Sequence, residues 1–241
     1  MSAPSPAGDV PAPAGDVHAP EERVHAPVLL GLGANLGDAL TQLAAAVELI
    51  GEVDGLAVEE VSSVYATPPW PPPGDPRHVP QDDYLNLVVR ARATVGPEEL
   101  LAELLELEAL LGRDRRVEQR WGPRPIDIDL LVHGTELRDR PELTVPHPRI
   151  TERAFVLIPM LEVWPGGELP GTTPDGRTGV RPAAALAALA THGPVEDILL
   201  VGRLEDVPTS HLARPDGPSA PAAGFARPGL EDVAREHGAE A

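Results

Sequence analysis

The sequence contains no lysine and no cysteine, so each of its 19 basic residues is an arginine. Without lysine, the chain cannot supply the lysine of a nucleotide-binding P-loop or of a Schiff base. Without cysteine, it cannot form a disulfide scaffold, a thiolate nucleophile or a thiolate zinc site. The sequence also has no run of 18 apolar residues, and its first 25 residues contain neither the basic nor the apolar region of a signal peptide. We therefore expect no membrane span, no signal peptide and a cytoplasmic protein.

Positive charge is scarce, because 38 acidic residues face 19 basic ones and the formal net charge is −19. A surface of this sign repels nucleic acid and anionic lipid, so we expect neither as a partner. The 241 residues suffice for one large domain or two small ones. Aromatic residues make up only 3% of the chain, so the position of each one is informative.

The 30 prolines and 23 glycines are too many for one compact domain, and they are unevenly spread along the chain. Residues 1–27 are rich in Pro, Ala and Gly and repeat the motif Pro-Ala-Gly-Asp-Val, and residues 209–241 have a similar composition with scattered acids. Neither segment has enough apolar residues to offset its chain entropy. We predict a disordered tail at 1–27, a disordered or marginally helical acidic tail at 209–241, and one domain over 28–208.

Hydrophobic patterning predicts alternating strands and helices between the tails. Strands are expected at 28–33, 56–65, 85–93 and 126–132, and helices at 38–50 and 97–111. This order is that of the ferredoxin-like split βαβ arrangement. Further helices are expected at 154–161 and 182–191, with a last strand at 198–201. The prediction is an α+β fold: a ferredoxin-like βαββαβ core with extra helices, and a mainly antiparallel sheet flanked by helices.

A pair of carboxylates, Asp127 and Asp129, lies on the predicted strand at 126–132. Because side chains alternate along a strand, the two share one face, about 6–7 Å apart, while the intervening Ile128 points to the other. A half-exposed strand with a polar outer face is the plain alternative. A hard divalent cation would relieve the repulsion, and Mg²⁺ is commonly held by one or two carboxylates together with substrate phosphates.

Arginines surround this pair: nine lie within residues 113–153, and five of them within residues 113–124. A solvated surface of mixed charge would explain an arbitrary segment of this kind. However, the planar guanidinium suits phosphate oxygens, and here it occurs beside paired aspartates. Arginines and paired aspartates together indicate a site for a magnesium–nucleotide complex.

Other candidate residues lie in loops. Both tyrosines and Trp70 flank a proline-rich loop at 71–83, where rings and the amide of Asn86 could bind a planar heteroaromatic ligand, although strand-end packing is the simpler explanation for any one of them. His147 lies between two prolines, which restricts its loop. The glycines at 31–37 do not have dinucleotide-binding spacing, and more simply let the backbone approach a ligand.

Seven short motifs, taken together and in order, resemble the 6-hydroxymethyl-7,8-dihydropterin pyrophosphokinases of folate biosynthesis. They are Gly-Ala-Asn-Leu-Gly (33–37), Tyr-Ala-Thr-Pro-Pro (65–69), Asp-Tyr-Leu-Asn (83–86), Leu-Gly-Arg-Asp-Arg (111–115), Arg-Trp-Gly-Pro-Arg-Pro-Ile-Asp-Ile-Asp (120–129), Val-Pro-His-Pro-Arg (145–149) and Arg-Ala-Phe-Val-Leu-Ile-Pro (153–159). The resemblance covers about residues 28–165. It implies transfer of an intact pyrophosphate from ATP to the hydroxymethyl group of the pterin, with AMP as the other product.

The resemblance also assigns roles to residues. It implies that Asp127 and Asp129 bind two Mg²⁺ ions and that the catalytic residues are Arg113, Arg115, Arg124, Asp127 and Asp129. It places ATP against Arg115, Arg120, Arg124, Leu130, Thr144, His147 and Arg153. It forms the pterin pocket from Gly33, Thr67, Pro68, Pro69, Tyr84, Asn86, Trp121 and Phe155. No general base is evident.

The sequence departs from the family pattern in its loops. Ala34 replaces a frequent serine, Trp70 replaces smaller apolar residues, and the 71–83 and 113–120 loops are longer than in some members. Two alternatives are an inactive binding module and a magnesium-dependent phosphoryl or nucleotidyl transferase acting on another small alcohol. The expected ligands are ATP and the pterin, and we expect a monomer that works with other folate-pathway enzymes.

Overall fold

The computed structural model describes residues 25–72, 74–164, 167–169, 179–190 and 197–206. The predicted tails, 1–27 and 209–241, lie outside the described residues, except for residues 25–27 of the first tail, where strand β1 begins at Ala26. No helix within the described ranges is long and apolar enough to cross a membrane.

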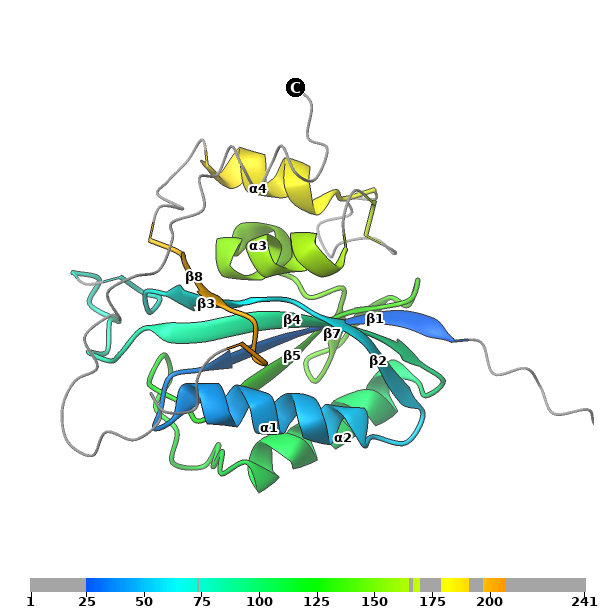
Figure 1. The fold of residues 1–241 in the computed structure, drawn as a ribbon, viewed down its shortest axis with the longest axis horizontal. Helices are drawn as coiled ribbons and strands as arrows, with labels where there is room; N and C mark the ends of the chain where they lie inside the picture. The colour runs from blue at the N-terminus through cyan, green and yellow to red at the C-terminus, as the bar shows by residue number, and fades with distance from the viewer. Residues whose placement is uncertain (1–24, 73, 165–166, 170–178, 191–196, 207–241) are drawn as a thin grey trace, which may run out of the picture.

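A six-stranded antiparallel sheet forms the centre of the molecule (Figure 1). Its strands are β1 (Ala26–Ala34), β2 (Leu56–Val61), β3 (Val64–Thr67), β4 (Tyr84–Ala93), β5 (Asp127–His133) and β8 (Leu199–Gly202). They lie in the order β5-β1-β4-β3-β8, and β2 also pairs with β4. A separate hairpin of two short strands, β6 (Arg138–Asp139) and β7 (Thr144–Val145), is not predicted by the sequence pattern.

The helices connect the strands in split βαβ units. Helix α1 (Ala39–Gly51) leads from β1 to β2 with β4 between the two strands, and α2 (Pro97–Leu110) leads from β4 to β5 with β1 between them. Figure 1 shows α1 and α2 on one face of the sheet, and α3 (Ala154–Val163) and then α4 (Pro182–Ala190) on the other. The 3₁₀ turn η1 (Ile150–Glu152) precedes α3. The predicted α+β, ferredoxin-like fold is confirmed.

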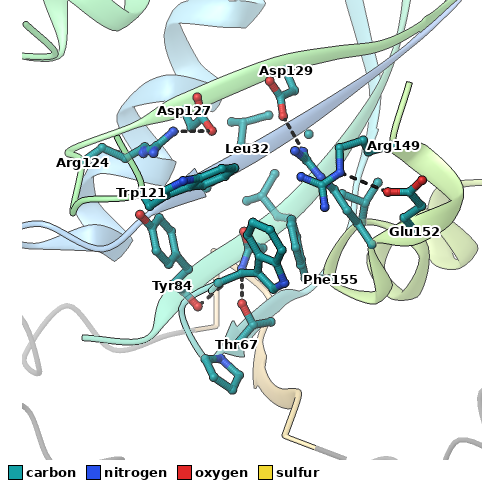
Figure 2. A pocket seen from close by; sticks show the side chains of 18 residues that line it. Leu32, Thr67, Tyr84, Trp121, Arg124, Asp127, Asp129, Arg149, Glu152 and Phe155 are labelled. Carbon is teal, nitrogen blue, oxygen red and sulfur yellow. Dashed lines mark hydrogen bonds and ion pairs between the residues drawn. The ribbon is translucent and has the colours of Figure 1, made fainter. Parts of the chain in front are cut away.

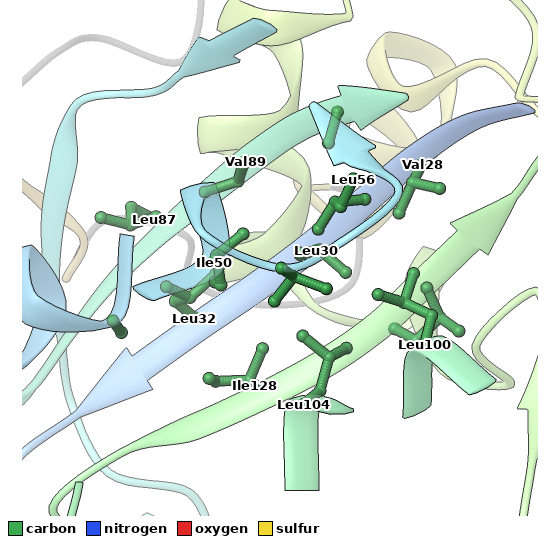
Figure 3. Close-up of a cluster of buried hydrophobic side chains, with 14 of the residues drawn as sticks. Val28, Leu30, Leu32, Ile50, Leu56, Leu87, Val89, Leu100, Leu104 and Ile128 are labelled. Carbon is green, nitrogen blue, oxygen red and sulfur yellow. The ribbon is translucent and has the colours of Figure 1, made fainter. Parts of the chain in front are cut away.

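The main hydrophobic core lies between the sheet and the helices α1 and α2 (Figure 3). Alternate residues of β1, among them Leu30 and Leu32, face it, as does Ile128 of β5. Helix α2 contributes Leu100 and Leu104, both fully buried. Because Ile128 faces this core, its neighbours Asp127 and Asp129 point to the opposite face, as the alternation predicts.

The second face of the sheet is covered by α3. This helix is buried nearly all round, since it packs against the sheet through Val156 and Met160 and against α4 through Leu157 and Leu161. At the start of α3, Arg153 donates a hydrogen bond to Asp129 of β5 at 3.1 Å. The start of this helix therefore lies beside the carboxylates of β5.

The single strand predicted at 56–65 is broken in the structure into β2 and β3. At the break, the hydroxyl of Ser62 accepts a hydrogen bond from the backbone N–H of Val88 at 2.9 Å, and the backbone N–H of Ser62 donates to the carbonyl of Val88 at 2.9 Å. The side chain thus replaces one ladder contact, which hydropathy patterning cannot show. Beyond the break, β3 ends at the pocket.

Candidate active site

A pocket lies over β1, β4 and β5 and beside the start of α3 (Figure 2). Eleven of the residues predicted from the sequence line it: Gly33, Thr67, Pro68, Tyr84, Asn86, Trp121, Arg124, Asp127, Asp129, Arg153 and Phe155. Figure 2 shows the two aspartates on one side of the cavity and Thr67 on the other, with Trp121 and Phe155 between them. The structure thus combines residues from five separate segments in one cavity.

A polar edge is built where β1 and β4 lie side by side. Gly33 pairs with Asn86 across the two strands. A Cβ atom at position 33 would lie 2.9 Å from the Oδ1 atom of Asn86, so only glycine leaves that amide in place. The Nδ2 atom of Asn86 donates to the hydroxyl of Thr67 at 2.8 Å. The amide is therefore fixed in orientation, as an edge that reads a ligand's hydrogen-bonding pattern must be.

Aromatic rings supply the walls of the same half of the pocket. Tyr84, Trp121 and Phe155 line it, and so does Trp70, whose ring meets that of Trp121 edge-on with centroids 4.9 Å apart. Burial raises the pKa of Tyr84. Trp121 has a φ of 66°, a left-handed conformation that bulky residues rarely adopt. Backbone strain of this kind accumulates at functional sites, where surrounding contacts enforce it.

The carboxylates of Asp127 and Asp129 line the other half. Burial and the charge of Asp127 raise the pKa of Asp129 to about 6, against the opposing effect of Arg153. Burial alone would also raise the pKa of Asp127, but Arg124 and Arg113 outweigh it and lower that pKa. The pair therefore holds at least one fixed negative charge and resists a second one, which a bound cation would stabilise.

Two predicted phosphate-binding arginines lie against this pair. Arg124 donates through NH1 to Asp127 at 3.1 Å, and Arg153 donates through NH1 to Asp129 at 3.1 Å. Both side chains are partly exposed to the cavity. Each guanidinium uses only part of its five N–H donors here, so the remaining ones can reach oxygens of an anionic ligand.

Arg113 does not line the pocket, although it contacts Asp127 directly. It is buried, with its side chain 4% exposed, and NH1 also donates to Glu108 of α2 at 2.6 Å. Glu108 also pairs with the exposed Arg115 and accepts the backbone N–H of Ile128 at 2.8 Å. Arg113 thus holds Asp127 from behind.

The remaining predicted residues do not line the pocket. His147 is fixed by its backbone N–H, which donates to the carbonyl of Leu131 at 2.8 Å. Burial, together with the charges of Arg153 and Arg149, lowers the pKa of His147 to about 4, so this ring is neutral at neutral pH. The other four are placed as follows: Leu130 and Pro69 are buried, Thr144 is on β7, and Arg120 is exposed with its guanidinium 5.1 Å from the centroid of Trp121.

Several residues of the site were not predicted from the sequence. Asn35 donates to Gln81 at 2.8 Å and accepts from the backbone N–H of Arg124 at 2.9 Å. Gln81 in turn donates to the carbonyl of Trp121 at 2.7 Å and accepts from the hydroxyl of Tyr84 at 3.1 Å. These contacts connect three loops far apart in sequence. Asn35 had a signal, since it lies inside the 33–37 motif, whereas Gln81 had none.

Arg149 and Glu152 also line the pocket without having been assigned to it, and so does Trp70, which the sequence pattern offered as a ligand-binding ring but the family resemblance did not assign. The guanidinium of Arg149 lies 4.9 Å from the centroid of Trp70 and donates to Glu152 at 3.1 Å. Figure 2 shows Arg149 and Glu152 beside the start of α3, on the side of the cavity away from Tyr84. The contact between Arg149 and Trp70 spans 79 positions in the sequence, so no local pattern predicts it.

The carboxylate pair fits Mg²⁺. Asp127 and Asp129 offer the hard oxygen ligands that this ion prefers, and their mutual repulsion favours a cation. Within the described residues, no group of three or more His, Cys, Asp or Glu could hold a metal ion. An ion here would need oxygens from a phosphorylated ligand as well, which is usual for Mg²⁺. Together with the arginines and the aromatic half-pocket, this defines an enzyme that transfers a phosphate-type group to a small planar acceptor.

Comparison with known proteins identifies the family. The family model for 7,8-dihydro-6-hydroxymethylpterin-pyrophosphokinase matches residues 29–165, more than half of the chain. The 2-amino-4-hydroxy-6-hydroxymethyldihydropteridine pyrophosphokinase of Methylorubrum extorquens is 45% identical over 58% of this chain and 85% of its own length. The Bacillus subtilis enzyme of the same name is 38% identical over 63% of this chain and 87% of its own length. The chain belongs to this family of folate-biosynthesis enzymes.

Solved structures support the fold. A crystal structure of HPPK-DHPS in complex with substrates is similar with a TM-score of 0.52 and 12% identity, over 73% of this chain and 46% of the other. The HPPK-DHPS of Plasmodium falciparum gives a TM-score of 0.54 at 15% identity, over 75% of this chain and 50% of the other. The chain spans about half the length of these proteins, so the likeness concerns the fold of one part.

Proposed function

We propose that the ring-lined half of the pocket binds 6-hydroxymethyl-7,8-dihydropterin and that the carboxylate half binds MgATP. The observation that carries this proposal is the presence of both halves in one cavity: a fixed amide edge among aromatic rings, and paired aspartates with arginines. The amide of Asn86, oriented by Thr67, would read the edge of the pterin, while Tyr84, Trp121 and Phe155 contact its faces. We also propose pterin contacts at Gly33 and Pro68, which line the pocket, and at the neighbouring Pro69.

The reaction proposed is transfer of an intact pyrophosphate. A bond forms between the hydroxymethyl oxygen of the pterin and the β-phosphorus of ATP, and the bond from that phosphorus to the oxygen bridging to the α-phosphorus breaks. AMP leaves with the electron pair, and the hydroxyl proton is released. The aspartates would hold two Mg²⁺ ions, which neutralise charge on the phosphate oxygens. Arg124 and Arg153 would bind the same oxygens, so this chain contributes chiefly orientation and charge neutralisation.

We also propose roles for the predicted residues that do not line the pocket. Arg113 would hold Asp127 in its ligating position and, through the edge of its guanidinium that includes Nε, would also contact the phosphates. The exposed Arg115 and Arg120 would close on the same phosphates. His147, neutral at neutral pH, would donate or accept a hydrogen bond at the phosphates without adding charge. Thr144 and the backbone of Leu130 would lie near the nucleoside. A kinase acting on another small alcohol is not favoured, because it would leave the Asn86–Thr67 edge unused. We propose that the chain acts as a monomer beside other folate-pathway enzymes.

The test is a product assay. The chain is incubated with ATP, Mg²⁺ and 6-hydroxymethyl-7,8-dihydropterin, and the nucleotide product is separated by chromatography. Formation of AMP in equal amount to the pterin diphosphate supports pyrophosphate transfer. Formation of ADP would show single-phosphate transfer, and no product would show an inactive binding module. Asp127→Ala abolishes turnover if the assignment is right, whereas Asp139→Ala, on the surface hairpin, serves as a matched control and retains it.

A further inference from the structure

One carboxylate, that of Glu118, lies between two of the arginines that the proposed function assigns to phosphate. Glu118 belongs to the loop that joins α2 to β5, and its side chain is 17% exposed. Its Oε2 atom accepts from both Nε and NH2 of Arg113, at 3.3 and 3.1 Å. Its Oε1 atom lies 3.4 Å from Nε of Arg124. Glu118 thus bridges the two guanidiniums.

Arg113 and Arg124 divide their N–H donors among the carboxylates in the same way. Arg113 uses NH1 for Glu108 and Asp127, and Arg124 uses NH1 for Asp127. The edge that includes Nε faces Glu118 in both residues. An arginine offers this planar edge to a carboxylate or to a phosphate in the same geometry. Glu118 therefore occupies donors that a phosphate group would need.

The contact with Arg124 is the weak half of this bridge. Both Oε1 of Glu118 and Nε of Arg124 are buried, and neither has a hydrogen-bond partner of good geometry among the described residues. Unmet buried polar atoms cost free energy, and a ligand that satisfies them recovers it. Of the three carboxylates around Arg113, Glu108 and Asp127 belong to α2 and β5, whereas Glu118 belongs to a loop. Glu118 is the partner that can move away.

We propose that Glu118 is an internal counter-ion, which holds the phosphate-binding edge of Arg113 and Arg124 until the phosphates of the nucleotide displace it. The inference rests on the proposed function, since it concerns the affinity of that same site. Competition by Glu118 lowers nucleotide affinity, because binding must first break its contacts with both arginines. Removing its charge while keeping its shape therefore tightens nucleotide binding.

The test uses the full chain with Glu118→Gln and titration calorimetry with the α,β-methylene analogue of ATP in Mg²⁺. We expect binding about fivefold tighter than in the unchanged chain, the factor that one partly exposed ion pair supplies. Inorganic tripolyphosphate should show the same gain, since the effect concerns phosphate and not the nucleoside. The matched control is Asp114→Asn, which removes one charge from the same loop but pairs only with Arg116, a side chain 88% exposed.

The outcomes separate the inference from the proposed function. Unchanged or weaker binding by Glu118→Gln, beside normal binding by the unchanged chain, would overturn the counter-ion role and leave a positioning role. An equal gain in Asp114→Asn would overturn it too, by showing a general charge effect. No binding of the analogue to any of the three proteins would instead refute the proposed function. The pterin affinity of Glu118→Gln, measured without nucleotide, shows whether the loop is intact, and we expect it to be unchanged. If Glu118→Gln does not fold, Glu118→Asp, which is too short to bridge both arginines, is expected to show a smaller gain.

Discussion

Replacing Glu108 by glutamine should destabilise the protein, because it removes a buried charge while keeping the shape of the side chain. Glu108 lies on α2 with its side chain 2% exposed, and it contacts Arg113, Arg115 and the backbone N–H of Ile128. It therefore fastens the helix, the arginine loop and the strand of the aspartates to one another. Glutamine keeps the volume and one carbonyl acceptor but removes the charge.

The magnitude follows from what each partner loses. Breaking a buried ion pair costs about 3–5 kcal/mol when it leaves a charge without a partner. Arg113 keeps Asp127 and Glu118, so its charge stays paired, and Arg115 is exposed. We therefore expect Glu108→Gln to lower the free energy of unfolding by about 2 kcal/mol. Glu108→Ala also leaves the Ile128 N–H without an acceptor, which adds about 1–3 kcal/mol.

The assay is urea denaturation followed by circular dichroism, with turnover measured in parallel. Glu106→Gln is the matched control, since Glu106 is an exposed residue of the same helix and should change the unfolding free energy little. Turnover should fall in Glu108→Gln, because Arg113 loses one of the contacts that set its position behind Asp127. If Glu108→Gln and Glu106→Gln unfold at the same urea concentration, the buried junction has no energetic role and the reasoning is refuted.

Three further predictions concern the pocket. Asp129→Asn should stabilise the ligand-free protein by about 1 kcal/mol after solvent screening, seen as a higher thermal midpoint, because the repulsion between the carboxylates at 127 and 129 is gone. AMP formation should stop, and normal turnover would contradict the metal assignment. Asn86→Ala should weaken pterin binding about tenfold to a hundredfold in calorimetry and leave nucleotide affinity intact; equal losses for both ligands would show a collapsed pocket instead. His147 has a folded-state pKa of about 4 against 6.5 unfolded, so the unfolded chain binds its proton first as the pH falls. The free energy of unfolding should therefore drop by about 2 kcal/mol from pH 7 to pH 5. His147→Gln should remove this drop in urea titrations at the two pH values, and an equal drop in both proteins would disprove the assignment.

The sequence predicted the fold well, because long segments of the chain follow one period. Leu100, Leu104 and Leu107 of α2 recur on the face that packs into the core. The strand alternation at Ile128 correctly puts Asp127 and Asp129 on the side away from the core. The break after Val61 was missed, since a serine hydroxyl that replaces a backbone contact leaves no trace in hydropathy. The β6–β7 hairpin was missed too, because strands of two residues have no period to detect.

The site was predicted only where residues lie within a short motif. Asp127 and Arg124 are three positions apart, so their contact is visible in the sequence. Glu108 had a signal that was not used: it follows Leu100 and Leu104 at intervals of four, so it falls on the buried face of α2. A carboxylate at such a position needs a buried partner. By contrast, the packing of Arg149 on Trp70 depends on the whole fold.

The two halves of the pocket share one structural support, the segment from Arg113 to Asp127. At its start, Arg113 is held by Glu108 and contacts Asp127. Near its end, the backbone N–H of Arg124 is held by Asn35, and the ring of Trp121 reaches the acceptor side of the cavity. A ligand that draws the guanidiniums away from Glu118 acts on the same loop that carries Trp121. We therefore expect nucleotide and pterin binding to be coupled, because each ligand would change the free energy of placing this loop for the other.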